Sequence, residues 1–276
     1  MSSTIDVSDL PALGEDHSVT PEQVESFRRD GHVTLRGVCS EAEIALYRPH
    51  ICAAVQRLNE ETRPLEQRDT YGRAFLQVWN IWVRDAAVAR FVLARRFARI
   101  AADLMGVDGV RLYHDQALFK EPRGGHTPWH QDRYYWPLDT DDTITMWMPL
   151  VDIPAGMEFA TGSHRNADMR GTRISDDSDQ YFADLLAAQG TTITPVGPLR
   201  AGDATFHDGW MVHRAPDNPT GLMREVMTVI SYADGTRVGA TDSEERRTDL
   251  ARWLPGLQTG DLAASELNPV LYRRGR

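Results

Sequence analysis

The sequence predicts a mainly β protein in which helices come first and pack outside a barrel or a double sheet. Helical periodicity is confined to the first 105 or so residues, and short strand-like runs separated by turn signals follow from Gly106 onward. The 276 residues, 41% of them hydrophobic, are enough for one large core. We expect a flexible extension over residues 1–18 and a single domain over residues 19–276.

Three helices are expected in the N-terminal part. The first begins at Thr20, whose capping box is completed by Gln23, and it ends at Gly31. A second capping box at Ser40 begins a helix whose apolar residues recur at helical spacing. The third helix is expected over residues 86–104, because a continuous apolar stripe runs along it.

The rest of the chain favours strands. The run at 143–151 is almost continuously apolar or β-branched, which predicts a strand covered on both faces. The polar stretch at 166–180 has no clear period and is interpreted as an irregular insertion of the kind that forms lids. Strands are expected at 32–35, 109–119, 128–132, 143–151, 191–196, 203–213 and 223–233.

Composition excludes several classes of protein. A net charge of -10 and a pI near 5.4, with no basic stripe, argue against a nucleic-acid partner and favour a small-molecule substrate. No apolar run is long enough to cross a membrane and residues 1–18 do not resemble a signal peptide, so we expect no membrane partner and a cytoplasmic protein. Two cysteines, Cys39 and Cys52, agree with a reducing compartment.

A metal site is predicted from one motif. The chain contains a single His-x-Asp, His130-Gln131-Asp132, and a later histidine, His213, is followed by Arg224. Alternate residues of a strand point to the same side, so His130 and Asp132 can reach one ion. Two histidines and a carboxylate on one face of Fe(II) leave positions free for a chelating co-substrate and O₂. The set therefore predicts a non-haem iron site with a co-substrate anchor.

Other histidines and the tryptophans leave alternatives open. His126 has helical zinc spacing to His130, but Pro128 between them argues against that helix. His207 would lie about 20 Å from His213 on an extended strand, too far to share an ion unless a turn intervenes. The tryptophans at 129, 136, 147 and 210 suit a ligand cavity or an ordinary aromatic core.

Several runs together resemble the phytanoyl-CoA dioxygenase family of Fe(II)/2-oxoglutarate oxygenases. They begin with Glu22 to Gly31, His114 to Lys120 and Thr127 to Asp132. The turn Gly162-Ser163-His164 and the distal run from Gly202 through His213 and Asn218 to Arg224 complete the resemblance, which covers residues 20 to about 235.

The resemblance implies a double-stranded β-helix, or jelly roll, that uses Fe(II), 2-oxoglutarate and O₂. It implies His130, Asp132 and His213 as iron ligands, and Arg224 as the partner of the distal carboxylate of 2-oxoglutarate. A planar guanidinium suits that role because it offers two parallel donors to a carboxylate. Three further residues are expected at the co-substrate: Gln116, Trp147 and Thr127.

The substrate is expected to be a bulky, partly aromatic or polycyclic small molecule, in keeping with bacterial relatives that act in antibiotic and other secondary-metabolite biosynthesis. Hydroxylation, epimerisation, desaturation and cyclisation all remain open, whereas the carboxylate of Asp132 argues against halogenation. Segments 157–185 and 61–78 are expected to form a lid, and Lys120 to be solvated or at the pocket rim. The residues expected to line the substrate pocket are Tyr134, Tyr135, Trp136, Met157, Phe159 and Trp210.

Two other classes of protein remain as rivals. One is a cupin-like isomerase or ligand-binding protein that holds a metal without redox chemistry, and it would not need Arg224. The other is a structural or interaction protein, which would tolerate loss of His130. Turnover of 2-oxoglutarate distinguishes the oxygenase from both.

Overall fold

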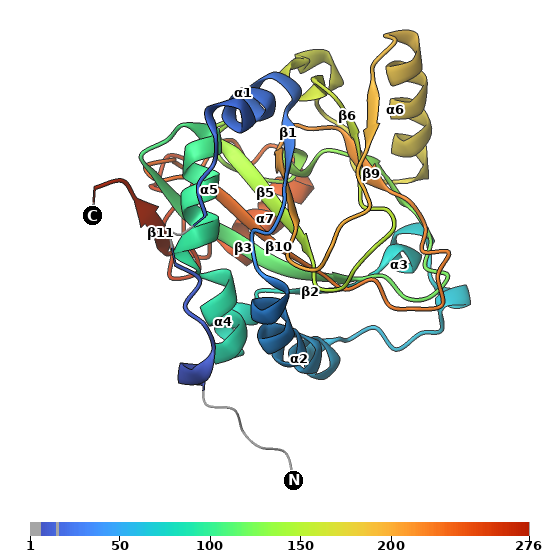
Figure 1. Ribbon diagram of the computed structural model, residues 1–276. Coiled ribbons are helices and arrows are strands. Elements are labelled where there is room, and N and C mark those ends of the chain that lie inside the picture. The colour runs from blue at the N-terminus through green and yellow to red at the C-terminus, as the bar shows by residue number, and fades with distance from the viewer. Residues whose placement is uncertain (1–6, 15–16, 276) are drawn as a thin grey trace.

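Two antiparallel sheets form a double-stranded β-helix in the computed structural model, which describes residues 7–14 and 17–275 (Figure 1). This confirms the predicted fold class. The large sheet runs in the order β1 (His32–Leu35), β8 (Ala204–Asp208), β5 (Thr143–Pro149), β10 (Val226–Ala233), β3 (Gly109–Phe119) and β11 (Val270–Arg273), with β2 (Leu76–Trp79) also paired to β3. The small sheet runs β4 (Thr127–His130), β9 (His213–Ala215), β6 (Glu158–Ala160) and β7 (Ile193–Pro195).

Helices cover the outer surfaces of both sheets. The N-terminal helices α1 (Pro21–Asp30), α2 (Glu41–Leu58), α4 (Ala86–Val92) and α5 (Arg95–Met105) share the main core with the large sheet. On the other side, α6 (Asp176–Ala188) packs on β4 and stands beside β6 and β9 in Figure 1. The remaining α-helices are α3 (Thr70–Ala74) and α7 (Glu244–Trp253), and short 3-10 helices occur at Val7–Asp9, Leu65–Gln67, Ile81–Val83, Asp132–Tyr134, Ser163–Arg165 and Ala167–Met169.

Alternation along the strands of the large sheet separates a helix-facing side from an inner side. Met146 and Met148 of β5 belong to the core under the N-terminal helices, whereas Thr145 and Trp147 line an interior cavity. The same parity holds in β10, where Val229 joins that core and Thr228 lines the cavity. Because β5 is covered on both faces, its sequence at 143–151 is almost continuously apolar or β-branched, as the strand prediction assumed.

Most N-terminal elements agree with the sequence, and one helix does not. Both capping boxes form, at Thr20 and Ser40, and the first helix ends at Gly31 in the left-handed conformation. The single helix expected over 86–104 is wrong, because the extended backbone of Ala94 (ψ 128°) divides it into α4 and α5. Since the apolar stripe continues across Ala94, the hydrophobic periodicity of the sequence does not indicate the break between α4 and α5.

The N-terminal segment also departs from a loose extension. Leu10 and Leu13 are 2% and 4% exposed and belong to the main core, so for these two residues the prediction of a flexible extension is wrong. Apolar side chains buried among helices α2 and α4 stabilise this piece of chain in place. The same predicted extension contains the 3-10 helix Val7–Asp9, and its residues 1–6 and 15–16 lie outside the described residues.

Two strand predictions fail around the site. The strand expected at 203–213 is divided between β8 in the large sheet and β9 in the small sheet, with a turn at 209–212 between them. The strand expected at 128–132 ends at His130, and Asp132 begins a 3-10 helix. The irregular insertion expected at 166–180 contains the start of α6, whose capping box joins Ser175 and Ser178.

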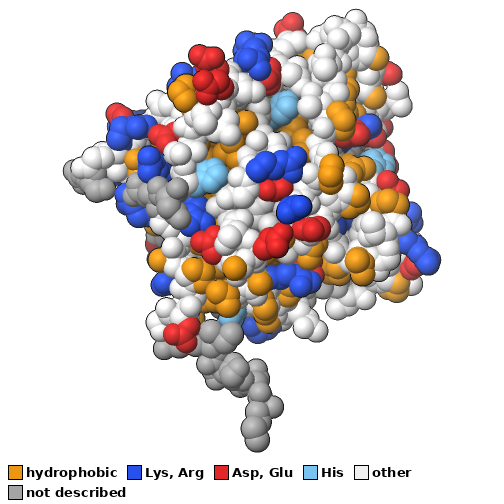
Figure 2. Space-filling view, in the orientation of Figure 1, with side chains coloured by type: hydrophobic (Ala, Val, Ile, Leu, Met, Phe, Trp, Pro, Cys, Tyr) orange, Lys and Arg blue, Asp and Glu red, His pale blue; other side chains and the backbone are white. Residues whose placement is uncertain are grey.

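Charged side chains of both signs share the surface (Figure 2). On the face shown in Figure 2, Lys and Arg side chains are interspersed with Asp and Glu. Among the described helices, none is both long and apolar enough to span a membrane.

Candidate active site

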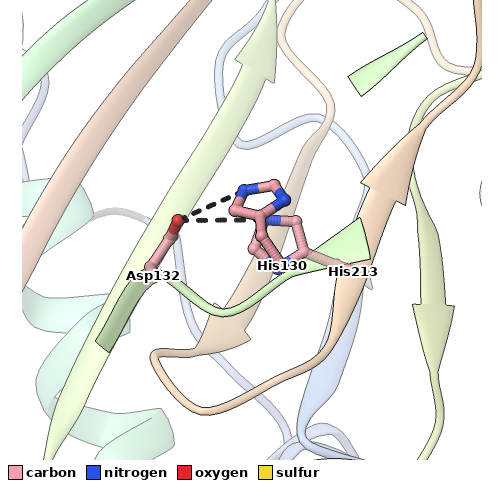
Figure 3. Close-up of side chains that lie close together, drawn as sticks. All are labelled: His130, Asp132 and His213. Carbon is pink, nitrogen blue, oxygen red and sulfur yellow. Dashed lines mark ion pairs between the residues drawn. The ribbon is translucent and has the colours of Figure 1, made fainter. Parts of the chain in front are cut away.

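Strand pairing in the small sheet brings two predicted ligands together. His130 of β4 and His213 of β9 are direct cross-strand partners, and their ring centres lie 4.1 Å apart. Asp132 approaches the pair from its 3-10 helix, with Oδ1 at 3.6 Å from His130 Nε2 and 3.9 Å from His213 Nε2 (Figure 3). One potential ligand atom from each of the three residues lies within 4.8 Å of the other two. The described residues therefore contain a cluster that could hold a metal ion.

Backbone carbonyls orient both imidazole rings. His130 Nδ1 lies 2.8 Å from the carbonyl oxygen of Pro128, and His213 Nδ1 lies 2.9 Å from that of Met211. A carbonyl can only accept, so each Nδ1 carries the proton and donates, which leaves both Nε2 lone pairs free. Burial, together with the neighbouring rings of His130 and His207, lowers the pKa of His213 well below its usual range. Both rings thus turn Nε2 toward Oδ1 of Asp132.

The large sheet holds the other oxygen of Asp132. Thr145 Oγ1 donates to Oδ2 at 3.0 Å, and His207 Nε2 lies 3.3 Å from the same atom. His207 and Thr145 are themselves cross-strand partners. Burial opposes ionisation of this carboxyl, but the surrounding histidines outweigh it and hold the pKa of Asp132 well below its usual range. Oδ1 is left to face the histidines.

His207 lies much closer to His213 than the predicted extended strand would place it. The turn at 209–212 folds β9 back across β8, so the rings of His207 and His213 lie 4.4 Å apart rather than at the separation of an extended strand. His207 nevertheless contacts the carboxylate rather than joining the cluster of three. His126 does not join it either, because its ring lies 3.4 Å from Asp179.

A second set of groups is suited to an anionic co-substrate. Arg224 is 8% exposed and lies on the cavity wall with its guanidinium carbon 5.8 Å from the ring centre of Trp147. Its Nε has no hydrogen-bond partner, Nη1 reaches only a carbonyl at 3.5 Å, and it forms no ion pair with any described residue. The hydroxyl of Thr127, also on the wall, is buried without a partner. A buried, unpaired guanidinium and an unsatisfied hydroxyl on the wall of one cavity fit a carboxylate ligand such as 2-oxoglutarate.

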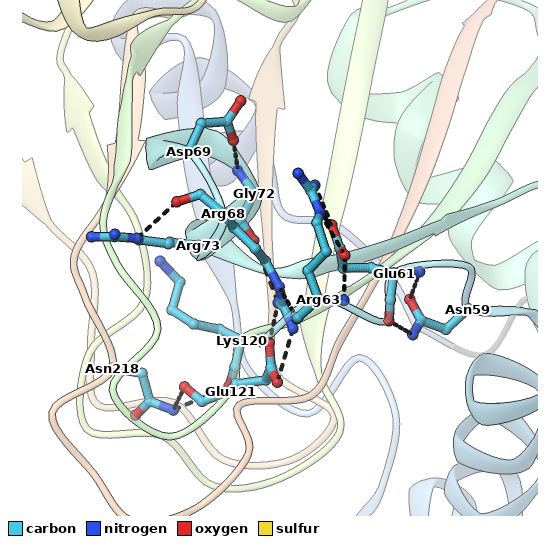
Figure 4. A network of polar contacts seen from close by, with 10 residues as sticks. All are labelled: Asn59, Glu61, Arg63, Arg68, Asp69, Gly72, Arg73, Lys120, Glu121 and Asn218. Carbon is cyan, nitrogen blue, oxygen red and sulfur yellow. Dashed lines mark hydrogen bonds and ion pairs between the residues drawn. The ribbon is translucent and has the colours of Figure 1, made fainter. Parts of the chain in front are cut away.

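A polar network that includes Lys120, Glu121 and Asn218 (Figure 4) fixes the chain next to Arg224. Asn218 donates its amide hydrogens to the carbonyls of Lys120, Glu121 and Leu222 at 3.1, 3.1 and 2.7 Å. Backbone hydrogen bonds of 2.9 Å join Lys120 and Arg224 in both directions. The loop before β10 is therefore tied to the end of β3, which places the guanidinium in the cavity.

Lys120 does not lie where the sequence suggested. It is 0% exposed rather than solvated or at the rim, and its ammonium donates to the carbonyls of Gly125 and Pro216. Burial, followed by the charge of Arg224, lowers the pKa of Lys120 to about 6. Its visible contacts are with the backbone, so it supports the loop that carries Arg224.

The cluster and Arg224 share one cavity of about 950 Å³. Its wall includes Gln116, Trp147, Thr127, Tyr135, Trp136 and Met157, all predicted at the site. Phe159, Tyr134 and Trp210 do not line it, contrary to expectation. Phe159 is fully buried behind the histidines and stacks on His32 at 4.5 Å, while the indole N–H of Trp210 donates to Asp141 at 2.7 Å.

Part of the cavity wall was not foreseen. Helix α7 contributes Asp249, Arg252 and Trp253, and β2 contributes Trp79. Their only signal in the sequence is weak amphipathic spacing, which does not say where a C-terminal helix packs. The two segments expected to form a lid do reach the cavity, and they meet where Thr70 Oγ1 donates to Asp176 Oδ2 at 3.2 Å.

Comparison with known proteins agrees with this geometry. Residues 27–226 match the model of the phytanoyl-CoA dioxygenase (PhyH) family. The structure resembles the non-heme alpha ketoglutarate dependent carbocyclase SnoK from nogalamycin biosynthesis, with 26% identity, a TM-score of 0.72 and coverage of 92% of this chain and 96% of that one. The epimerase SnoN, solved with Fe3+, alpha ketoglutarate and nogalamycin RO, is also 26% identical, with a TM-score of 0.72. That match covers 91% of this chain and 97% of SnoN. An ectoine dioxygenase of Nocardia farcinica is 24% identical, over 83% of each chain.

A double-stranded β-helix with a His-Asp-His cluster and a buried guanidinium in one cavity defines the class of the 2-oxoglutarate-dependent oxygenases. Within that class, the chain belongs to the phytanoyl-CoA dioxygenase family, as its sequence motifs predicted.

Proposed function

We propose that this protein is an Fe(II)- and 2-oxoglutarate-dependent oxygenase that oxidises a bulky small molecule in the biosynthesis of an antibiotic or another secondary metabolite. The observation that carries the proposal is one cavity that contains both the His130, Asp132 and His213 cluster and the unpaired guanidinium of Arg224. A non-redox cupin-like protein would need the cluster but would have no use for the buried cation.

Each residue has a defined part in this proposal. His130, Asp132 and His213 would hold the iron, and Arg224 with Thr127 would bind the distal carboxylate of 2-oxoglutarate. Bound Fe(II), with 2-oxoglutarate and O₂, supplies the oxidising power to break a substrate C–H bond. Trp147, on the wall beside Arg224, excludes water from the anchor, and Gln116 is held by a hydrogen bond of 2.6 Å from Gln77.

The substrate class follows from the cavity and from the relatives. A volume of about 950 Å³ accommodates more than the co-substrate alone. The two similar structures come from nogalamycin biosynthesis, one named a carbocyclase and the other an epimerase. Hydroxylation, epimerisation and cyclisation all begin with hydrogen removal, so the placement of the substrate against the metal would decide among them.

The iron site can be tested by the weak visible absorption of Fe(II)-chelated 2-oxoglutarate under anaerobic conditions. We expect the band in the wild-type protein and its loss in His130→Ala. His126→Ala is the matched control, because His126 lies near the same strand but pairs with Asp179 outside the cluster. An undiminished band in His130→Ala would rule out this ligand set, and iron binding without succinate formation in air would favour the non-redox rival.

The wall of the pocket can be tested at Met157. This residue lines the cavity, so Met157→Ala should change which candidate substrates are accepted while the 2-oxoglutarate band remains. Phe159→Ala serves as the contrast, because Phe159 is buried behind the histidines and its truncation should lower stability instead. An unaltered substrate profile in Met157→Ala would remove this residue from the substrate wall.

A further inference from the structure

Part of the cavity combines aromatic rings with a carboxyl group, and we call it the aromatic subsite. It is formed by Trp79 of β2, His114 of β3, and Asp249 and Trp253 of α7. The ring centres of Trp79 and Trp253 lie 6.5 Å apart, and those of His114 and Trp253 lie 4.6 Å apart. The proposed iron and co-substrate roles use none of these residues.

Asp249 is held by hydrogen bonds rather than by an ion pair. Tyr113 donates its hydroxyl hydrogen to Oδ2 at 3.1 Å, and the side chain of Trp253 also hydrogen-bonds to the carboxyl group. No described cationic group lies within 4.0 Å of Asp249, and the charge of Arg252 acts on it from farther away. Burial raises the pKa of Asp249 to about 7. A half-buried carboxylate with no cation in contact is costly, and a cation delivered by a ligand would lower that cost.

His114 provides a second, independent sign of a ligand. Its side chain lies on the cavity wall and is only 5% exposed, yet Nδ1 has no hydrogen-bond partner. Burial lowers the pKa of His114 to about 4, so the ring is neutral near pH 7 and does not repel a positive charge. A buried polar group is normally satisfied, so this unsatisfied one in a cavity indicates an absent partner.

The wider charge balance favours a cation. The same wall carries four more carboxylates besides the proposed iron ligand, from Asp69, Asp176, Glu244 and Glu245. Of the cavity arginines, Arg224 is assigned to the co-substrate and Arg214 is paired with Glu158 at 2.6 Å. That leaves Arg173 and Arg252 to oppose five carboxylates.

Arg252 also shows that the indole faces attract positive charge. Its guanidinium carbon lies 5.3 Å from the ring centre of Trp79 and 5.4 Å from that of Trp253. Such cation–π geometry is stabilising when the cation lies within about 6 Å of the ring.

We propose that the aromatic subsite binds a positively charged nitrogen of the primary substrate, a protonated or N-methylated amino group, between Asp249 and the indoles of Trp79 and Trp253. This inference rests on the proposed function, because it names the substrate class of that same cavity. The carboxylate supplies the charge, the rings supply faces of negative potential, and neutral His114 supplies a polar edge. The amine would fix the substrate in one orientation relative to the iron ligands.

The test compares a cation with a neutral molecule of the same shape. Benzyltrimethylammonium and 2,2-dimethylpropylbenzene are titrated into the full-length protein and followed by calorimetry. We expect the cation to bind about tenfold more tightly than the neutral analogue, and Asp249→Asn to remove most of that preference. Glu244→Gln is the matched control: it removes one carboxylate from the same helix and cavity, and should change affinity less than about twofold.

Two features keep the result decisive. An asparagine at 249 retains a carbonyl oxygen for the Tyr113 hydroxyl, and Trp79→Leu gives a second variant in which cation binding should fall several-fold. Equal binding of the two molecules, no binding of the cation, or full cation preference in Asp249→Asn would overturn the inference.

The absorption band of Fe(II)-bound 2-oxoglutarate is recorded on the same samples. Loss of that band with cation preference retained would reject only the proposed function, and the reverse would reject only the subsite.

Discussion

At the scale of single residues, the site is built from groups whose hydrogen bonds leave one reactive atom free. His130 and His213 each donate Nδ1–H to a carbonyl two residues earlier in the chain, so that Nε2 faces Asp132. Asp132 in turn commits Oδ2 to Thr145 and His207 and leaves Oδ1 facing the rings. Contacts within the protein therefore orient all three side chains for a metal ion.

Replacing Arg224 by lysine should weaken 2-oxoglutarate binding while iron affinity stays nearly unchanged. An ammonium cannot reproduce two parallel donors, so we expect a loss of about 1–3 kcal/mol, the range for hydrogen bonds to charged groups. Titration of the visible band with 2-oxoglutarate measures it. Arg214→Lys is the control, because Arg214 lines the same cavity but is committed to Glu158. An unchanged affinity in Arg224→Lys would mean that another group anchors the co-substrate.

Two threonines of the large sheet provide a matched pair for the iron site. Thr145 donates to Asp132, whereas the buried hydroxyl of Thr205 has no partner. Thr145→Val should lower iron affinity by about 10–100-fold, as is typical when a group supporting a metal ligand is removed. Thr205→Val should leave it unchanged and should not destabilise the fold. Equal iron affinities in the two variants, measured by competition with a chelator, would show that Thr145 does not position Asp132.

At the scale of elements, the sequence predicted those whose limits are marked by local chemistry. The capping boxes at Thr20 and Ser40 and the left-handed glycines at 31 and 106 mark helix ends through short-range hydrogen bonds. The division between α4 and α5 carries no proline or glycine, so it depends on packing that the local pattern does not contain. The turn at 209–212, which moves the chain from one sheet to the other, is equally a tertiary feature.

The same limit applies to the site. His130, Asp132, His213 and Arg224 could be predicted because their spacing forms a recognisable motif, although the strand geometry assumed for Asp132 is wrong. The sequence could not tell which aromatic residues line the pocket and which belong to the core, since an indole has the same local sequence pattern in both places. Trp136 lines the cavity and Trp210 does not, and only the contacts of their rings decide between them.

The segment at 61–78 is held by a buried arginine rather than left as a loose flap. Arg68 forms an ion pair with Glu121 and donates Nε–H to the carbonyl of Arg63 at 2.9 Å (Figure 4). Arg68→Met should therefore speed amide hydrogen exchange across 61–78, since an uncompensated Glu121 and lost backbone contacts loosen the segment. Arg63→Met is the control, because Arg63 is exposed and its side chain pairs only with Glu61 among the described residues. Equal exchange in the two variants would show that Arg68 does not hold the segment.

At the scale of the whole molecule, the fold gives up some stability to enclose a polar cavity whose wall carries a buried guanidinium. The two sheets pack through cores on their outer faces, while the inner faces carry threonines, histidines and tryptophans around the cavity. Arg224 and Lys120 are both buried and joined through their backbones, and neither has a carboxylate partner within 4.0 Å among the described residues. Burial and the charge of Arg224 therefore favour the neutral amine of Lys120, and an anionic co-substrate would supply the counter-charge that Arg224 lacks.

This arrangement predicts how the stability of the ligand-free protein changes with pH. In the folded state burial lowers the pKa of Lys120 to about 6, whereas in the unfolded chain it is near 10.5. Between these values the unfolded chain binds the extra proton, so the free energy of unfolding rises with pH by at most about 1.4 kcal/mol per unit. Lys120→Met removes that dependence but also loses the bonds to Gly125 and Pro216. Urea unfolding at pH 7 and pH 9 should therefore show a wild-type advantage over the variant that is larger at pH 9. Comparing the two proteins cancels every other titrating group, so an advantage that stays constant would mean that Lys120 is already protonated in the folded protein.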